Sequence, residues 1–184
     1  TLPSDAIGRV AKLFQQERDL TALFGSYDDD PGETNFLSQY RNLLHHYVHQ
    51  NGQEDASTFW GACGAIRRDV FLAMGGFDER YVTPSVEDIE LGYRLKRCGY
   101  SIRLCRSLQV KHWKRWELDS MLKADFFQRA LPWTDLILRD RHCINDLNTG
   151  MSGRASVILA FLLLSSVVFS FWITSTSGTR CGGF

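Results

Sequence analysis

Two acidic residues stand side by side in the stretch SVEDIELGYRL, residues 85–95. A carboxylate can act as a general base that takes a proton from a hydroxyl group, and a second carboxylate beside it can raise its pKa. A structural role is also open, because Ser85 and Asp88 have the spacing of a capping box and acids stabilise the first turn of a helix. Capping accounts for one acid better than for two, so Glu87 and Asp88 are both candidates for chemistry.

A second stretch, FWGACGAIRR at residues 59–68, is rich in small residues. Gly61, Ala62, Gly64 and Ala65 would let a ligand or another backbone segment approach closely. With Trp60 beside them they form a candidate substrate-binding segment. The alternative is a tightly packed strand whose small residues only make room for neighbouring protein.

The segment from Ser101 to Trp116 is strongly basic and contains no acidic residue. Such a segment could neutralise a diphosphate, or it could be a solvated basic face. Its cations are Arg103, Arg106, Lys111, Lys114 and Arg115.

Two further clusters could bind a metal ion. Asp28, Asp29 and Asp30 supply oxygen ligands for a hard cation, although a turn after a strand is the role we favour for YDDDP. The second cluster is the histidine group 45, 46 and 49, in which the first and last are four residues apart on an expected helix. No carboxylate or cysteine is placed to complete a ligand set, so we expect a solvated helix face there.

The segments GACGAIRRDVFLAMGGFDE, SVEDIELGYRLKRCGY and HWKRW follow one another in this order. Their order and spacing resemble the C-terminal half of a family 2 glycosyltransferase of the GT-A fold, over about residues 1–150. The resemblance implies transfer of a sugar, with inversion, from a nucleotide-sugar donor to an acceptor hydroxyl.

The resemblance also implies roles for matching positions. Asp88 would be the general base, with Glu87 beside it. Arg115 and Trp116 match the R-W of a Q-x-x-R-W element that borders the diphosphate and the acceptor. His112 stands where that element has glutamine, and it is our candidate metal ligand because a late histidine binds the metal in some GT-A enzymes.

Enzymes of this family hold Mg²⁺ or Mn²⁺ on the donor diphosphate with a D-x-D motif. The resemblance places that motif just before the segment that begins with Thr1, whereas YDDDP follows the next strand. We therefore expect the cation to be held mainly upstream of this chain, and the chain to be a C-terminal part that is inactive alone.

The elements that position these residues alternate between helix and strand, which predicts an α/β layered domain. Residues 2–16 and 35–50 have helical periodicity, 69–77 form a short helix ended by Gly75-Gly76, and a further helix begins at Ser85 and stops at Gly99. Strands are expected at 20–27, 58–68 and 100–110. The positions expected to face inward are Ile7, Val10, Leu13 and Phe14; Phe36, Tyr40, Leu43, Leu44 and Tyr47; and Ile89, Leu91, Tyr93, Leu95 and Cys98.

Aromatic residues and cations alternate after position 112. This mixture predicts an interfacial amphipathic segment at residues 113–150, although a helix docked on its own domain is the alternative. The residues concerned are Trp113, Trp116, Phe126, Phe127, Leu131 and Trp133, interleaved with Lys114, Arg115, Lys123 and Arg129.

The segment Ala155–Ile173 contains no charged residue. At about 1.5 Å per residue it would form a helix of about 28 Å, close to the thickness of the hydrocarbon core of a bilayer. It predicts a transmembrane helix within residues 151–184. Arg139, Arg141 and Arg154 precede it and only Arg180 follows, so the positive-inside rule places residues 1–150 in the cytoplasm.

The 184 residues carry 21 basic and 21 acidic side chains, which argues against a nucleic acid partner. The five cysteines are scattered without a C-x-x-C pair, so free thiols in a reducing compartment are expected. We predict part of a GT-A catalytic domain at 1–112, the interfacial segment and the membrane helix. The function expected is a membrane-anchored glycosyltransferase acting on a glycan or lipid-linked acceptor, and the alternative is a non-catalytic membrane-anchored binding module.

Overall fold

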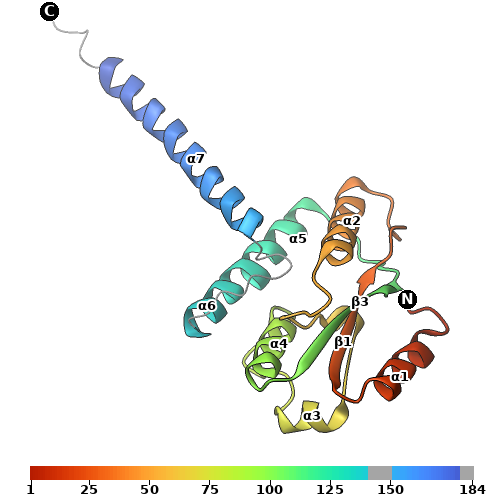
Figure 1. Ribbon diagram of the computed structural model, residues 1–184. Helices are drawn as coiled ribbons and strands as arrows, with labels where there is room; N and C mark the ends of the chain where they lie inside the picture. The colour runs from red at the N-terminus through yellow and green to blue at the C-terminus, as the bar shows by residue number, and fades with distance from the viewer. Residues whose placement is uncertain (141–150, 179–184) are drawn as a thin grey trace, which may run out of the picture. The chain divides into compact units, whose positions relative to one another are not determined.

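The computed structural model describes residues 1–140 and 151–178 of the chain. The chain divides into two compact units, Thr1–Leu147 and Asn148–Phe184. The first unit is mixed α/β, and in its described part a sheet of three strands is covered by helices (Figure 1). The expected α/β class is therefore confirmed.

The sheet has the order β2-β1-β3, with β1 (Leu20–Tyr27) in the centre. β1 pairs with β3 (Ser101–Val110) in parallel and with the short β2 (Gly64–Ile66) in antiparallel register. Every residue of β1 is buried, as expected for a strand with neighbours on both edges and helices on both faces.

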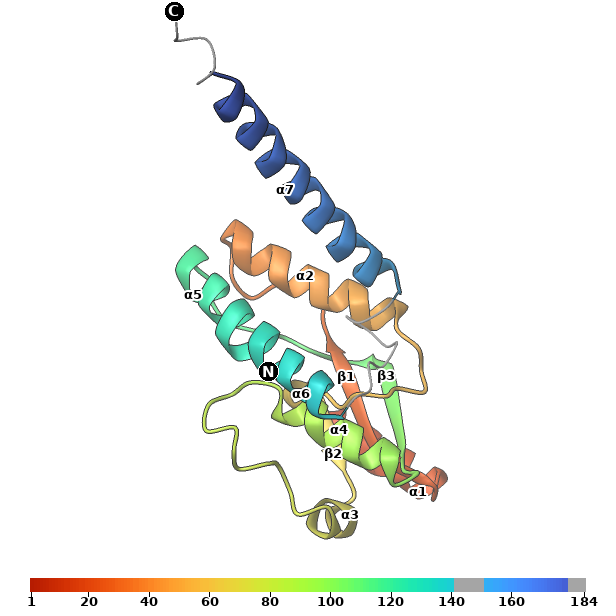
Figure 2. The same ribbon diagram turned by 90° about the vertical axis from the view of Figure 1, so that its left-hand side faces the viewer.

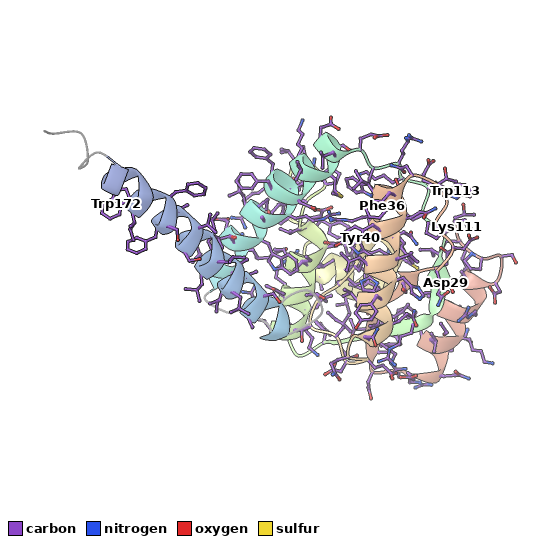
Figure 3. The ribbon with its side chains drawn as sticks, turned by 90° about the horizontal axis from the view of Figure 1, so that it is seen from above. Asp29, Phe36, Tyr40, Lys111, Trp113 and Trp172 are labelled. Carbon is purple, nitrogen blue, oxygen red and sulfur yellow. The ribbon has the colours of Figure 1, made fainter. Side chains whose placement is uncertain are left out.

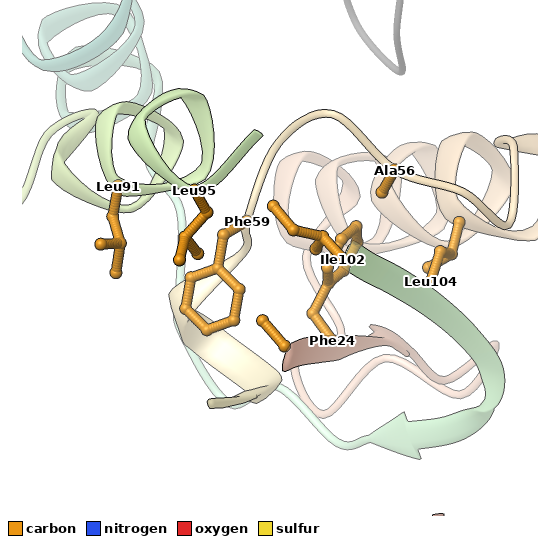
Figure 4. Close-up of a cluster of buried hydrophobic side chains, with 8 residues drawn as sticks. Phe24, Ala56, Phe59, Leu91, Leu95, Ile102 and Leu104 are labelled. Carbon is orange, nitrogen blue, oxygen red and sulfur yellow. The ribbon is translucent and has the colours of Figure 1, made fainter. Parts of the chain in front are cut away.

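Helices cover both faces of the sheet. On one face, α1 (Ala6–Gln16) packs against residues of β1 and β3. On the other face, the main core joins the sheet to α4 (Glu87–Arg97) and to the loop before β2 (Figures 2 and 4). This core consists of Ala22, Phe24, Ala56, Phe59, Leu91, Leu95, Ile102 and Leu104.

The expected strand at 58–68 is wrong in length, because only Gly64–Ile66 pair with β1. The preceding residues run across α4 instead of along the sheet. A Cβ atom at Gly92 of α4 would lie 2.4 Å from the backbone nitrogen of Phe59, so the glycine permits this crossing. The chain then makes a 3₁₀ turn at Gly61–Cys63 before it enters the sheet.

The short helix α3 (Arg68–Ala73) ends as expected, since Gly75 and Gly76 both have positive φ. The helix-ending role of Gly99, with φ of 80°, is also confirmed. The buried stripe of α4 contains Leu91, Tyr93 and Leu95 as expected, and Ile89 packs beside it, but Cys98 is exposed.

Two helices differ from the expected burial pattern, α1 at one position and α2 (Phe36–Asn51) along its whole inward stripe. In α1, Val10, Leu13 and Phe14 pack against the sheet as expected, but Ile7 is exposed. In α2 the expectation is wrong throughout, because the buried residues are Ser38, Asn42 and His49. All five apolar residues expected inside are exposed: Phe36, Tyr40, Leu43, Leu44 and Tyr47.

After β3 the chain forms α5 (Leu118–Lys123), a π-helical turn η2 (Ala124–Ala130) and α6 (Leu131–Asp140). Leu136 and Trp133 of α6 pack against Val86 and Tyr93, and Trp133 Nε1 donates a hydrogen bond of 3.2 Å to the Tyr93 hydroxyl. This segment is thus docked on its own domain through one face, and it leaves its other apolar side chains exposed.

The described part of the second unit is one helix, α7 (Met151–Gly178). Its segment Ala155–Ile173 has 19 residues and a mean hydropathy of 2.4, so it is long and apolar enough to cross a membrane. The expected apolar helix is therefore present.

The crossing at Gly92 yields a stability prediction. We expect Gly92→Ala to destabilise the fold by about 1–3 kcal/mol, the usual cost of overpacking, because the new methyl group meets backbone atoms of Thr58 and Phe59. Urea denaturation in detergent, followed by tryptophan fluorescence, measures this change. In the matched control Gly8→Ala the new methyl group meets nothing within 4 Å, so stability should rise by up to about 1 kcal/mol. Equal midpoints for the two variants would contradict the packing argument.

Candidate functional site

A pocket of about 300 Å³ gathers residues from six parts of the first unit. Among its lining residues are two carboxylates, Glu87 and Asp88, and three cations, Arg41, Lys114 and Arg129. Its remaining wall includes Tyr27, His45, Trp60, Ala62, Pro84, Ser85, His112, Trp116 and Gln128. Acidic and basic side chains facing one space, with aromatic rings between them, form a candidate active site.

Asp88 lies in the first turn of α4, where backbone N–H groups hold its carboxylate. Its Oδ2 accepts a hydrogen bond of 2.8 Å from the Gly61 N–H, and its Oδ1 accepts one of 2.8 Å from the Ile89 N–H. Each carboxylate oxygen can accept two hydrogen bonds, so both keep capacity for a substrate.

Burial raises the pKa of the Asp88 carboxyl above its ordinary value. The hydrogen bonds from Gly61 and Ile89 act in the opposite direction, and the negative charge of Glu87 adds to the rise. A carboxylate with a raised pKa is a better proton acceptor near neutral pH than an ordinary aspartate. This arrangement suits a general base.

Ser85 and Glu87 do not form the hydrogen bonds of a capping box in which Ser85 is the N-cap residue. The Glu87 carboxylate accepts a hydrogen bond of 2.6 Å from the Ser85 N–H, and the Ser85 hydroxyl donates one of 2.8 Å to the carbonyl of Gln128. The N-cap position is Val86. The expectation that Ser85 caps α4 is therefore wrong, and Ser85 instead connects the start of α4 to η2.

Aromatic rings form one wall of the pocket. The His112 ring stacks on Tyr27 at 4.4 Å between centroids, and Trp60 contacts Tyr27 edge-to-face at 4.8 Å. His45 stacks near Trp60 at 6.5 Å. A flat apolar wall of this kind suits the faces of a sugar or a base, and Trp60 remains a predicted binding residue.

Trp116 is buried and held by α2. The backbone N–H of Trp116 donates a hydrogen bond of 2.7 Å to the Ser38 hydroxyl, and its backbone carbonyl accepts one of 2.7 Å from the Asn35 side-chain amide. The cations Lys114, Arg41 and Arg129 lie 3.9, 5.5 and 5.7 Å from the centre of its ring. The buried Nε1 of Trp116 and Nε of Arg41 have no hydrogen-bond partner in the described part of the chain.

Asp125 of η2 holds two of these cations in place. It forms a two-point ion pair with Arg41 and accepts a hydrogen bond of 2.8 Å from Arg129. One carboxylate thus orders two guanidinium groups, and Lys114 completes a cationic surface around the tryptophan ring. Such a surface can bind a phosphate or diphosphate group.

Arg115 lies elsewhere, although the resemblance pairs it with Trp116. Its side chain is exposed and interacts with Glu117 at 2.8 Å and Glu33 at 3.6 Å, and it does not line the pocket. Lys114 takes the position beside the pocket instead. Arg103 and Arg106 of the basic segment also lie outside it.

The glycine-rich segment 61–64 contacts the candidate site through the backbone N–H of Gly61. Gly61 donates its N–H to Asp88, and a Cβ there would lie 3.4 Å from the Asp88 carboxylate. At Gly64 a Cβ would lie 2.4 Å from the Phe59 ring, so this glycine makes room for protein packing. Ala62 is exposed at the edge of the pocket.

The candidate metal ligands do not converge. Within residues 1–140 and 151–178, no group of three His, Cys, Asp or Glu side chains could hold a metal ion. Asp30 and Asp28 pair with Lys111, and Asp29 lies with Lys111 outside the pocket (Figure 3). His112 stacks on Tyr27 and lines both the candidate active site and a neighbouring pocket on the side of α1. The chain's described residues do not by themselves fit the expected cation, and no step proposed below involves it.

The histidines of α2 are not the solvated face that was expected. His49 is buried against Phe24, and His46 Nδ1 donates a hydrogen bond of 2.8 Å to the Tyr27 carbonyl. Burial lowers the pKa of His45 to about 3 and that of His49 to about 4, so both rings are neutral at physiological pH.

Several pocket residues were not singled out from the sequence as site residues. Arg41 belongs to α2, and Gln128 and Arg129 belong to η2, while His45 of α2 was considered only as part of the histidine cluster. The polar positions of α2 at 38, 41, 42, 45 and 49 share one helical face, and this spacing is the signal that could have identified them. The apolar stripe on the opposite side of α2 obscured it.

No protein-family model matches the chain. Part of the chain is similar to the N-acetylglucosaminyl-diphospho-decaprenol L-rhamnosyltransferase of Mycobacterium tuberculosis, with 43% identity over 54 residues in strain CDC 1551 / Oshkosh and in strain H37Rv. The match covers 29% of this chain and 17% of the length of each relative. The chain therefore has a partial similarity to a glycosyltransferase.

The buried histidines predict how stability depends on pH. In the unfolded chain His45 and His49 should titrate near pH 6.5, whereas in the fold their pKa values are about 3 and about 4. Between these values the unfolded chain binds more protons, so stability should fall as the pH drops from 7 to 5. NMR titration of the ring carbons should show both histidines neutral at pH 5 in the folded chain. Two rings that titrate near pH 6.5 would contradict this prediction.

Proposed function

We propose that this chain is the acceptor-side part of a membrane-attached, inverting glycosyltransferase of family 2 with a GT-A fold. The observation that carries the proposal is Asp88, a carboxylate of raised pKa held by backbone N–H groups in a pocket that also contains three cations. The partial similarity to a rhamnosyltransferase supports the same reaction class.

The proposed reaction uses Asp88 as the general base. Its carboxylate takes the proton of the acceptor hydroxyl, and the acceptor oxygen forms a bond to the anomeric carbon of the donor sugar. The bond between that carbon and the phosphate oxygen breaks on the opposite face, and the leaving nucleoside diphosphate takes the electron pair. Attack opposite the leaving group inverts the configuration at the anomeric carbon.

The three cations of the pocket would stabilise charge that develops on the diphosphate. Lys114, Arg41 and Arg129 surround the buried Trp116, and Asp125 keeps both guanidinium groups ordered. Preordered donors need no reorganisation during the reaction, which is why fixed cations contribute to rate as well as to binding.

The acceptor that we propose is lipid-linked. The mycobacterial relatives are named for a diphospho-decaprenol, which is a lipid-linked diphosphate, and this chain contains one helix long and apolar enough to span a membrane. A membrane helix in the same chain would keep the pocket close to such an acceptor. We further propose that the catalytic unit faces the cytoplasm, from the arginines that precede the apolar segment Ala155–Ile173.

Asp88→Asn tests the base. In the full-length native protein, transfer from a nucleotide-sugar should fall by roughly 10²- to 10⁴-fold, the usual contribution of general base catalysis. The amide can accept from only one of the two N–H groups that the carboxylate serves, but it also removes a buried charge. These effects oppose each other, so stability should change by about 1 kcal/mol or less.

The matched control is Glu87→Gln, which still accepts the hydrogen bond of Ser85 and only removes a charge. Activity should be lost as the pH falls through the raised pKa of Asp88, and Glu87 contributes to that rise. Glu87→Gln should therefore shift the acid limb of the kcat/KM profile to lower pH while transfer continues. If Asp88→Asn keeps normal transfer, or loses it only in proportion to melting temperature, Asp88 is structural and the binding-module alternative is favoured.

Lys114→Ala and Arg115→Ala test which cation serves the diphosphate. Lys114 lines the pocket, so its removal should weaken nucleoside diphosphate binding by about tenfold or more, the equivalent of one charge-assisted hydrogen bond. Arg115 pairs with Glu117 and Glu33 outside the pocket, so its removal should change affinity little. Isothermal titration calorimetry measures both values. The reverse ranking would support the role that the family resemblance assigns to Arg115.

A further inference from the structure

The outer face of α2 is apolar from Phe36 to Tyr47. Its large side chains recur with helical spacing from Phe36 to Tyr47, and both of these residues are exposed, at 77% and 64%. Phe36 and Tyr40 stack on each other at 6.2 Å between ring centroids. We call this surface the α2 apolar face; it consists of Phe36, Tyr40, Leu43, Leu44 and Tyr47.

No charged side chain interrupts the α2 apolar face. Among the 16 residues of α2 there is no acid, and the only arginine or lysine is Arg41. Arg41 turns away from this surface, because its side chain is 12% exposed and pairs with Asp125. A helix that faces water normally carries charges on its outer side, so this surface is built for a different environment.

The orientation of α2 is fixed by contacts on its inner side. Ser38 accepts a hydrogen bond from Trp116, and Asn42 donates one of 2.9 Å to the Asp28 carbonyl. His45 lines the candidate active site and His49 packs in the core. Rotating the helix to bury its apolar stripe would break these contacts, so the exposed face is a consequence of the site itself.

Exposed apolar side chains continue beyond α2. The helix lies beside the segment 116–125, to which the Arg41–Asp125 ion pair and the Asn35–Trp116 hydrogen bond connect it. Figures 1 and 2 show α2 and α5 adjacent at one end of the first unit, and Figure 3 looks down on this end. The exposed apolar residues of the longer stretch 113–131, which contains this segment, are Trp113, Leu118, Leu122, Phe126, Phe127 and Leu131.

We propose that the α2 apolar face is a second membrane-contacting surface, which seats the catalytic unit on the lipid bilayer independently of α7. Its occupant is the interfacial region of an anionic membrane. Aromatic and aliphatic side chains enter the boundary between headgroups and acyl chains, and Lys114, Arg115 and Lys123, which are exposed on the adjoining segment, contact lipid phosphates.

Two observations favour lipid over a protein partner. The same chain carries an apolar helix able to span a membrane, so the first unit would be tethered beside a bilayer whenever that helix inserts. The exposed cations next to the apolar surface suit the negative charge of anionic lipid. This inference does not depend on the transferase activity, because it uses only the surface of α2 and its neighbours.

Photocrosslinking of the full chain tests the proposal. Tyr40 is replaced by the photoreactive residue p-benzoylphenylalanine, and the protein is reconstituted in nanodiscs of phosphatidylcholine and phosphatidylglycerol. After irradiation, mass spectrometry should find lipid adducts at position 40 at a yield several-fold above a matched position. That control is Leu72 of α3, which is 57% exposed and lies at the opposite end of the first unit (Figures 1 and 2). Tyr47 serves as a second test position on the same face.

Phe169 of α7 reports separately on insertion of the apolar helix. Lipid adducts at Phe169, Tyr40 and Tyr47, with few at Leu72, support the proposal. Adducts at Phe169 without adducts at Tyr40 and Tyr47 overturn it. Crosslinks from position 40 to a second copy or to α7 also overturn it, because another protein surface then covers α2. Adducts at Tyr40 and Tyr47 without adducts at Phe169 also support the proposal, because the α2 apolar face then contacts lipid without insertion of α7. If none of the three positions forms a lipid adduct, the proposal is overturned.

Discussion

The close approach between α4 and the chain at Thr58–Gly61 is the constraint on which the candidate site depends. Gly92 lets the backbone of Thr58 and Phe59 cross α4 at a distance that any side chain would prevent. That crossing brings the N–H of Gly61 to the Asp88 carboxylate, at 2.8 Å. The same contact therefore holds the helix against the sheet and orients the proposed base, so the geometry of the candidate site and the fold share one packing interaction.

Trp116 also lines the pocket, and like the Gly61–Asp88 contact it both packs the fold and positions charged groups of the candidate site. Its backbone is bonded to Ser38 and Asn35 of α2, while its ring is surrounded by cations that Asp125 helps to order. A buried aromatic ring in contact with cations is stabilised by their attraction to its π-electrons. The cations remain at the pocket surface, where a diphosphate could replace part of their solvation.

The orientation of α2, with its polar side inward, determines both the candidate active site and the α2 apolar face. Its polar residues lie inside, where Ser38 and Asn42 form hydrogen bonds with Trp116 and Asp28 and where His45 stacks near the ring of Trp60. Because the apolar stripe lies on the opposite side of α2 from these polar residues, it must face outward, where water is a poor environment for it. A pocket built from polar residues and a surface suited to lipid are thus two results of the same helical register.

The alternation of elements, the central strand Leu20–Tyr27, the helix stop at Gly99 and the apolar segment Ala155–Ile173 follow from local patterns, because propensity and periodicity act within one segment. The pair of carboxylates, Glu87 and Asp88, could also be identified because the two residues are adjacent in the sequence.

The sequence did not determine which face of α2 would be buried, since hydrophobic periodicity identifies a stripe but not its environment. Nor did it decide that Lys114 rather than Arg115 lines the pocket, or that Ser85 bonds to Gln128 rather than capping α4. These outcomes depend on contacts between residues far apart in the chain, and only tertiary packing selects among them.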